Sequence, residues 1–270
     1  MYIGKKLIYL QLQKTGCTHI ADLLSKMIPG KQVGKHNWLK NYNTDKFIIG
    51  SIRNPLDWYV SLWAYGCSKK GALFNNLTNR KYSMLSSFKE FIVSGNLFFT
   101  EFINEFIKSY NSWNETYEDY NDANNFRLWL KLMYNSERKI DLGEKYYSSS
   151  ISNFAGFMTY RYCKLHMKDF FKKICFKDIK TYDELLKYDK NNNILDYVIR
   201  NESLGNDLIK ALEFAGYNIT DTIINLIMDS EKQKKNVSKH RDINFYYDSE
   251  TKKLVLKREK FIIEKYNYKI

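Results

Sequence analysis

The stretch KLIYLQLQKTGCTHIADLLSKM, residues 6–27, decides the fold. Residues 6–12 form a short apolar run rich in strand-forming side chains, and a loop with one glycine, residues 13–18, follows at once. Apolar residues then recur at the spacing of one helix face: Ile20, Leu23, Leu24 and Met27. This order predicts a strand, a tight loop and a helix.

The same pattern recurs further along the chain. Residues 46–52 (KFIIGSI) have the composition of a second buried strand, and Asn54 and Pro55 supply an N-cap and a first-turn proline for a following helix. Between the two units, Pro29-Gly30 ends the first helix. Strands that alternate with helices predict an α/β fold, with a mostly parallel sheet covered by helices on both faces.

The middle of the chain has a different character. From residue 68 to about residue 173, aromatic-rich helical segments alternate with polar loops, which we interpret as a helical insertion. The expected helices are residues 88–93, 98–107, 126–134 and 154–171. A strand at residues 194–199 then precedes a helix that Gly216 ends, and Asp248 caps a last helix to about Tyr266. Without a proline-rich linker or an internal repeat, residues 1–270 are predicted to form one domain.

Composition excludes several classes of protein. Hydrophobic residues make up 44% and charged residues 27%, which excludes a disordered tail, a collagen-like repeat and a disulfide-stapled miniprotein. No apolar run reaches the roughly 18 residues of a membrane helix, and the first residues lack the order of a signal peptide. We therefore expect a cytoplasmic protein without a membrane span.

The net charge of +13 favours an anionic partner, such as nucleic acid, an acidic glycan or a phosphorylated small molecule. Compositional drift is the simpler explanation of the bulk charge, because the chain is crowded with Asn, Ile, Tyr and Lys, as is typical of an AT-rich genome. Charge therefore indicates function only where it is localised.

A localised anion site is predicted at residues 14–18. A helix that begins after a glycine-containing loop presents unpaired N–H groups and a partial positive charge to one point. Lys14 adds a positive charge, and Thr15 and Thr18 add hydroxyl donors. The alternative is that Gly16 only turns the chain and Lys14 is solvated. The loop does not fit the NTPase pattern GxxxxGK[ST], because Lys14 precedes its only glycine.

A second anion site is predicted after the second strand. Arg53 follows that strand directly, and Ser61 lies eight residues later on the next helix. Because the ends of parallel strands meet at one edge of a sheet, both residues are expected near the first loop. A guanidinium and a hydroxyl suit a phosphate monoester. Taken singly, Arg53 suits a structural ion pair and Ser61 a helix-face hydroxyl.

Together the two segments resemble a known family. QKTGCTH (13–19) and SIRNPLDWYVSLW (51–63) resemble the 5′-phosphosulfate loop and the 3′-phosphate motif of sulfotransferases that use PAPS, 3′-phosphoadenosine 5′-phosphosulfate. Residues 192–216, and residues 236–239 (NVSK) followed by Tyr246-Tyr247 and the last helix, are similar to bacterial members related to glycan sulfotransferases. Residues 154–162 are similar to a stretch seen in bacterial members.

The resemblance implies a three-layer P-loop-type fold and the transfer of a sulfuryl group from PAPS to an acceptor hydroxyl, leaving PAP. A carbohydrate or glycan acceptor is favoured, with no metal and no nucleic-acid partner. The residues implied to bind the nucleotide are Lys14, Thr15, Gly16, Cys17, Thr18, His19, Arg53, Ser61, Asn236, Ser238 and Lys239.

Two residues are implied to be catalytic. Lys14 would stabilise charge on the leaving phosphate, and His36, in a loop before the second strand, would accept the proton of the acceptor. Lys35 is a further candidate to contact the sulfate or the leaving group. The alternative for His36 is a surface histidine in a polar loop.

The chain departs from the family pattern at two positions. Cys17 replaces a hydroxyl residue, so only its backbone N–H is expected to bind phosphate. His19 stands where some relatives have an aromatic that stacks on adenine, and helix packing is the alternative.

The loop with Asn236, Ser238 and Lys239 would close over the nucleotide, or it is a solvated charged loop. In the insertion, an acceptor pocket or core packing accounts for these residues: Trp113, Trp129, Tyr160 and Arg161.

Two other classes of function remain open from the residues. One is another P-loop enzyme, such as a small-molecule kinase, and the other is a basic non-enzymatic module that binds nucleic acid or acidic polysaccharide.

Overall fold

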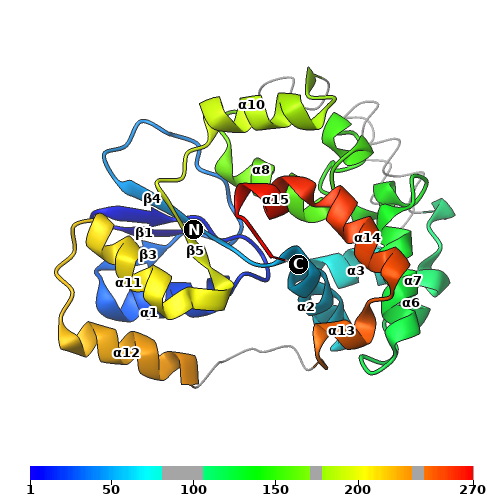
Figure 1. The fold of residues 1–270 in the computed structure, drawn as a ribbon, viewed down its shortest axis with the longest axis horizontal. Coiled ribbons are helices and arrows are strands. Elements are labelled where there is room, and N and C mark those ends of the chain that lie inside the picture. Colours follow the sequence, from blue (N-terminus) through cyan, green and yellow to red (C-terminus); the bar gives the residue numbers. More distant parts are fainter. Residues whose placement is uncertain (81–105, 171–177, 233–239, 270) are drawn as a thin grey trace.

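The computed structural model describes residues 1–80, 106–170, 178–232 and 240–269 (Figure 1). The expected helix at residues 88–93 and most of that at residues 98–107 lie outside these ranges, as do Asn236, Ser238 and Lys239.

One five-stranded sheet organises the fold. Its strands are β1 (Tyr2–Gly4), β2 (Leu7–Tyr9), β3 (Gly30–Gln32), β4 (Phe47–Ile52) and β5 (Tyr197–Arg200), in the order β3-β1-β2-β4-β5. Strands β2, β4 and β5 are parallel, whereas β1 is antiparallel to both β2 and β3. The expected strands exist, but the sheet is mixed rather than mostly parallel, because the short β1 and β3 extend it beyond β2.

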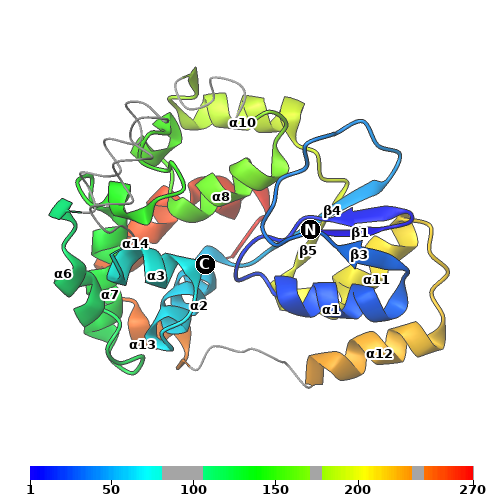
Figure 2. The same cartoon turned by 180° about the vertical axis from the view of Figure 1, so that it is seen from behind.

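Helices flank the sheet, with α1 (Cys17–Met27) and α11 (Leu204–Phe214) along one face (Figures 1 and 2). Alternation along β2 and β4 divides the apolar side chains between the two faces. Leu7, Tyr9 and Ile49 pack with α1, α11 and α12 (Asp221–Lys232). Ile8 and Ile48 belong to the larger core on the other face, with α2 (Pro55–Cys67) and α8 (Phe157–His166).

Capping side chains mark the starts of two helices, α2 and α14 (Ser249–Arg258). The Asn54 side chain accepts a hydrogen bond from the N–H of Leu56, with Pro55 in the first turn of α2. Asp248 accepts from the N–H of Thr251 at the start of α14. The expected last helix is broken at Glu259, and α15 (Lys260–Lys265) follows.

The inserted region is helical where it is described. It holds α3 (Ala72–Thr78), α6 (Tyr110–Glu115), α7 (Ala123–Tyr134), two short 3-10 helices and α8; α10 (Tyr182–Asn192) and α13 (Ile243–Tyr246) follow later in the chain. Trp113, Trp129 and Tyr160 are fully buried in the larger core. Their role is therefore packing, and an acceptor pocket built from these rings is excluded.

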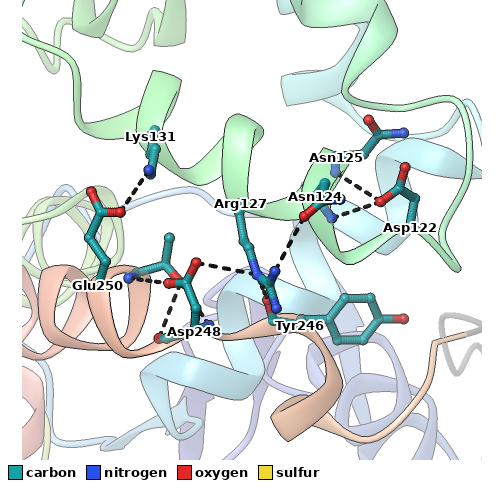
Figure 3. Close-up of polar contacts among 9 residues, drawn as sticks. Asp122, Asn124, Asn125, Arg127, Lys131, Tyr246, Asp248 and Glu250 are labelled. Carbon is teal, nitrogen blue, oxygen red and sulfur yellow. Dashed lines mark hydrogen bonds and ion pairs between the residues drawn. The ribbon is translucent and has the colours of Figure 1, made fainter.

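Polar contacts hold the C-terminal helices against α7 (Figure 3). Arg127 donates to the carbonyl oxygen of Tyr246 at 2.9 Å, and its Nε lies 3.5 Å from Asp248 Oδ2. One turn later, Lys131 pairs with Glu250 at 2.8 Å. The C-terminal segment is thereby fixed to the inserted region.

A buried histidine at the end of α8 predicts a pH dependence of stability. Within the described part of the chain, neither ring nitrogen of His166 has a hydrogen-bond partner. Burial lowers its pKa from 6.5 to about 3. Below pH 6.5 the unfolded chain therefore binds a proton that the folded chain does not bind until about pH 3. Between these two pH values the free energy of unfolding decreases by about 1.4 kcal/mol for each unit by which the pH is lowered.

We expect His166→Leu to remove this part of the pH dependence, and to cost less than about 1.5 kcal/mol at pH 7, because ring packing on Tyr162 is lost but no hydrogen bond is. Urea unfolding of both proteins at pH 7, 6 and 5 measures it: the variant should gain stability over wild type at each lower pH. Parallel free-energy curves would show that His166 does not titrate on unfolding.

Candidate functional site

A cavity of about 650 Å³ lies at the carboxyl ends of the three parallel strands. The loop after β2 lines it with Lys14, Arg53 lines it after β4, and Asn201 and Leu204 line it after β5. This is the edge at which open α/β sheets bind ligands. The two predicted anion sites therefore face one cavity, although they are far apart in the sequence.

Nearly all described residues predicted from the sequence line this cavity: Lys14, Gly16, Cys17, Thr18, His19, Lys35, His36, Arg53 and Ser61. Thr15 does not line it. Several residues that the sequence prediction did not include also line it: Tyr65, Lys70, Glu144, Asn201 and His240.

The loop after β2 has a strained backbone. Gly16 is the N-cap of α1 with φ 78°, and Lys14, which has a Cβ, is held at φ 62°. A Cβ at position 16 would approach Asn201 Nδ2 and Leu204 Cδ1 to 2.8 Å. Glycine is favoured at position 16 by its left-handed φ, whereas the approach to the ends of the Asn201 and Leu204 side chains could be relieved by small shifts of those side chains.

The hydroxyl of Thr15 is used inside the protein. Thr15 is fully buried, and its Oγ1 donates to the carbonyl oxygen of Leu12 at 2.8 Å and lies 2.6 Å from Ser51 Oγ. Ser51 in turn bonds the hydroxyl of Tyr9 at 2.7 Å. The expectation that Thr15 offers a hydroxyl donor to an anion is therefore wrong, because this network ties the loop to β4.

Lys14 is a cation whose charge depends on its surroundings. Burial, followed by repulsion from Arg53, lowers the pKa of Lys14 to about 8. Its Nζ lies 4.2 Å from the centroid of the Tyr65 ring, in a cation–π contact. An anion bound in the cavity would offset both the burial and the repulsion from Arg53, and would raise the pKa of Lys14 so that its charged form is favoured.

Cys17 and His19 are two further cavity-lining residues on α1. Burial raises the pKa of the Cys17 thiol, so it stays neutral at pH 7. His19 Nε2 lies 3.1 Å from Ser230 Oγ on α12, so the packing alternative has a physical basis, while the residue also lines the cavity.

His36 has the protonation state of a general base. Its Nδ1 lies 2.7 Å from the carbonyl oxygen of Gln11, which only accepts, so Nδ1 carries the proton and Nε2 keeps its lone pair. Burial lowers the pKa of His36, and the charges of Arg161 and Lys35 lower it further, against the opposing effect of the Gln11 bond. The ring is therefore neutral at pH 7.

The second predicted anion site has a buried hydroxyl and a partly paired guanidinium. Ser61, 3% exposed on α2, lines the cavity together with Arg53. Arg53 Nη2 lies 3.7 Å from Asp57 Oδ1, which is a long ion pair. Arg53 lies just before α2, and Asp57 lies in the first turn of α2. Glu202 accepts from the N–H of Asn54 at 2.6 Å, and its charge also acts on Arg53, so it both positions the start of α2 and partly compensates the guanidinium.

An ion cluster from the inserted region borders the cavity. Glu144 Oε1 accepts from Arg161 at 2.5 Å, and Oε2 accepts from Lys164 at 2.8 Å. Burial alone would raise the pKa of Glu144, but the two cations hold it at about 2. The sequence pattern indicated Arg161 but not Glu144, because no local pattern predicts which carboxylate pairs with Arg161.

No family model, curated protein or solved structure matches this chain. Across the described ranges, no group of three or more His, Cys, Asp and Glu side chains could hold a metal ion. None of the described helices is both long and apolar enough to cross a membrane. The chemistry of the cavity therefore carries the functional argument.

Proposed function

We propose that the protein is a sulfotransferase that transfers the sulfuryl group of PAPS to an acceptor hydroxyl. One observation carries the proposal: the Lys14–Thr18 loop and Arg53 line a single cavity with the neutral imidazole of His36. Two separated positive sites suit a ligand with phosphate at both ends, and the imidazole suits a proton acceptor.

The architecture of the sheet supports a P-loop-type assignment as part of this proposal. The loop connects β2 to α1, and the adjacent parallel strand β4 leads to Arg53 and α2. The N-terminus of α1 offers backbone N–H groups and a partial positive charge to the 5′-phosphate.

Size and charge fit such a ligand. A cavity of about 650 Å³ falls within the roughly 300–1,000 Å³ of small-molecule sites. Lys14, Lys35 and Arg53 line it, which favours a nucleotide that carries phosphate and sulfate groups.

In the proposed reaction, each of four cavity residues has its own role. The acceptor oxygen forms a bond to sulfur while the bond from sulfur to the phosphate oxygen breaks, in the in-line manner of phosphoryl transfer. His36 Nε2 takes the acceptor proton, and protonated Lys14 stabilises the negative charge that develops on the departing phosphate. Arg53 and Ser61 hold the 3′-phosphate.

Calorimetric titration with adenosine 3′,5′-bisphosphate, without magnesium, tests the nucleotide site, and transfer of radiolabelled sulfate from PAPS to sugars, lipids and phenols tests the reaction. We expect binding and label transfer. Binding of ATP only with magnesium would favour a kinase instead. RNA or heparin affinity that the bisphosphate leaves unchanged would favour a non-enzymatic basic module.

Arg53→Ala should weaken bisphosphate binding by about 1.5–3 kcal/mol, because a charge-assisted hydrogen bond to the 3′-phosphate is lost. Calorimetry measures the change. Adenosine 5′-monophosphate, which differs from the bisphosphate only in lacking the 3′-phosphate, is the matched ligand, and its affinity should change much less. An equal loss for both ligands would place Arg53 away from the 3′-phosphate, and an unchanged dissociation constant would remove it from the site.

A further inference from the structure

We propose that Gln32 is a positioning residue for His36, because its amide ties the loop that carries His36 to the residue whose carbonyl group fixes the imidazole. The role of His36 as a base rests on the proposed function. The orientation of its ring is argued from contacts alone, and the main experiment measures it without any reaction.

The loop that carries His36 has a strained backbone. Gly34 and His36 both lie in the left-handed region, with φ 62° and 58°, and His36 has a Cβ that disfavours it. Such strain persists only where the surrounding contacts determine the conformation. One contact is made by the imidazole itself, whose Nδ1 donates to the carbonyl oxygen of Gln11 at 2.7 Å. Gln11 lies just beyond β2, so this bond joins the loop to the central sheet.

Two glutamine side chains join the same two segments. Gln32 Nε2 donates to Gln11 Oε1 at 2.7 Å, and Gln11 Nε2 donates in return to Gln32 Oε1 at 3.2 Å. Gln32 Nε2 also donates to the carbonyl oxygen of Gly34, two residues before His36. A single amide group therefore bonds both the residue that accepts from the imidazole and the loop from which the imidazole extends.

The fold of β3 does not require the side chain of Gln32. All three residues of β3 are exposed, and the backbone of Gln32 pairs with that of Tyr2 in β1. The carbonyl oxygen of Gly34 also accepts from the amino group of Met1 at 2.8 Å. By contrast, the Gln11 side chain is only 1% exposed, so its amide needs a partner inside the protein. Replacing Gln32 should therefore leave the sheet intact and loosen the loop that follows.

The acceptor of the Nδ1 hydrogen bond decides which nitrogen of His36 can act as the base. A carbonyl oxygen only accepts, so the nitrogen that faces Gln11 carries the proton and Nε2 does not. Apart from burial, the groups that lower the pKa of His36 are Arg161, Lys35 and the amino group of Met1. All three act as positive charges, and a positively charged group does not accept a hydrogen bond. The neutral ring therefore takes its tautomer from the carbonyl group of Gln11, and a shift of that group or of the loop would mix the two tautomers.

Nitrogen NMR measures the tautomer of His36 in the protein without ligand or substrate. The chain has four histidines, and His36→Ala identifies the His36 signals by their loss. At pH 7, long-range proton–nitrogen correlations of the wild type should show Nδ1 protonated and Nε2 unprotonated. In Gln32→Met, which keeps the length of the side chain but removes its donor, both nitrogens should move to the averaged shifts of two exchanging tautomers. Lys31→Ala, on the same exposed strand, is the matched control and should leave both shifts unchanged.

A second variant separates the role of Gln32 from damage to the fold. Gln32→Met leaves the buried Gln11 amide without the partner that Gln32 supplies, and an unpaired buried amide destabilises a protein. Gln11→Met combined with Gln32→Met removes both amides and keeps the backbone carbonyl of Gln11, so it should give the same averaged shifts in a well-folded protein. A wild-type tautomer in either variant, or a wild-type ring protonated at Nε2, would overturn the proposal.

Turnover separates this proposal from the proposed function. If the wild type transfers label from PAPS, kcat of Gln32→Met should fall about tenfold or more while affinity for the bisphosphate stays unchanged, because only the base is displaced. Averaged shifts in Gln32→Met without label transfer by the wild type would keep the positioning of His36 and reject the sulfotransferase function. Label transfer with an unchanged kcat in Gln32→Met would keep the function and reject Gln32 as a positioning residue.

Discussion

His36→Ala lowers turnover by about 10²- to 10⁴-fold if His36 accepts the acceptor proton, which is the range for loss of a general base. Affinity for the bisphosphate should stay nearly unchanged, because the imidazole acts on the acceptor and not on the phosphates. Radiolabelled sulfate transfer and calorimetry measure the two quantities. His166→Leu is the matched histidine control, since His166 is buried away from the cavity. Full turnover in His36→Ala would exclude His36 as the base.

The same assignment predicts a bell-shaped pH dependence of kcat/KM. His36 must be neutral, and its pKa lies below 6.5, so activity should fall on the acid side of neutrality. Lys14 must be charged, and its pKa is about 8, so activity should fall again near that pH. His36→Ala should remove the acid limb and leave the alkaline limb. An acid limb that survives this substitution would belong to another group.

The second large effect is on stability. Glu259→Ala should cost at least about 3 kcal/mol of unfolding free energy, because a buried carboxylate with several donors is removed. Glu259 is fully buried and accepts from the Tyr59 hydroxyl at 2.5 Å and from Met158 and Thr159 at the start of α8. It therefore caps a helix that lies about a hundred positions earlier in the chain.

Glu250→Ala is the control for this prediction. Glu250 lies in the first turn of α14, 71% exposed, and pairs with Lys131 at the surface, so its loss should cost less than about 1 kcal/mol. Glu259→Gln keeps the size but places an amide donor against existing donors, and its cost should fall between the two. Urea denaturation measures all three. A loss below 1 kcal/mol in Glu259→Ala would show that water or a rearranged neighbour caps α8 instead.

The local elements of the sheet could be predicted from sequence, because their signals are local. The apolar run before Lys14 and the cap at Asn54 each lie within one segment, and β2, β4, α1 and α2 form there. By contrast, β3 (Gly30–Gln32) has three exposed residues after a proline and is paired by β1. Its strand conformation comes from that tertiary pairing, so the short pattern indicated only a turn.

The candidate site follows the same division. The meeting of Lys14 with Arg53 follows from the parallel order of neighbouring strands. The burial of the Thr15 hydroxyl against Ser51, and the pairing of Glu144 with Arg161, depend on how distant segments pack. A sequence pattern names residue types that suit an anion, but it does not say which of their polar atoms the fold has already used.

The left-handed backbone at two positions has a consequence for the evolution of this chain. Lys14 and His36 both carry a side chain where glycine would be relaxed, at φ 62° and 58°. Each such residue costs about 1–2 kcal/mol relative to glycine. Directed evolution for thermostability alone would therefore select glycine at both positions. The selected variants would be more stable but would lack the ammonium and the imidazole, so under the proposed function stability and turnover select different residues at these two positions.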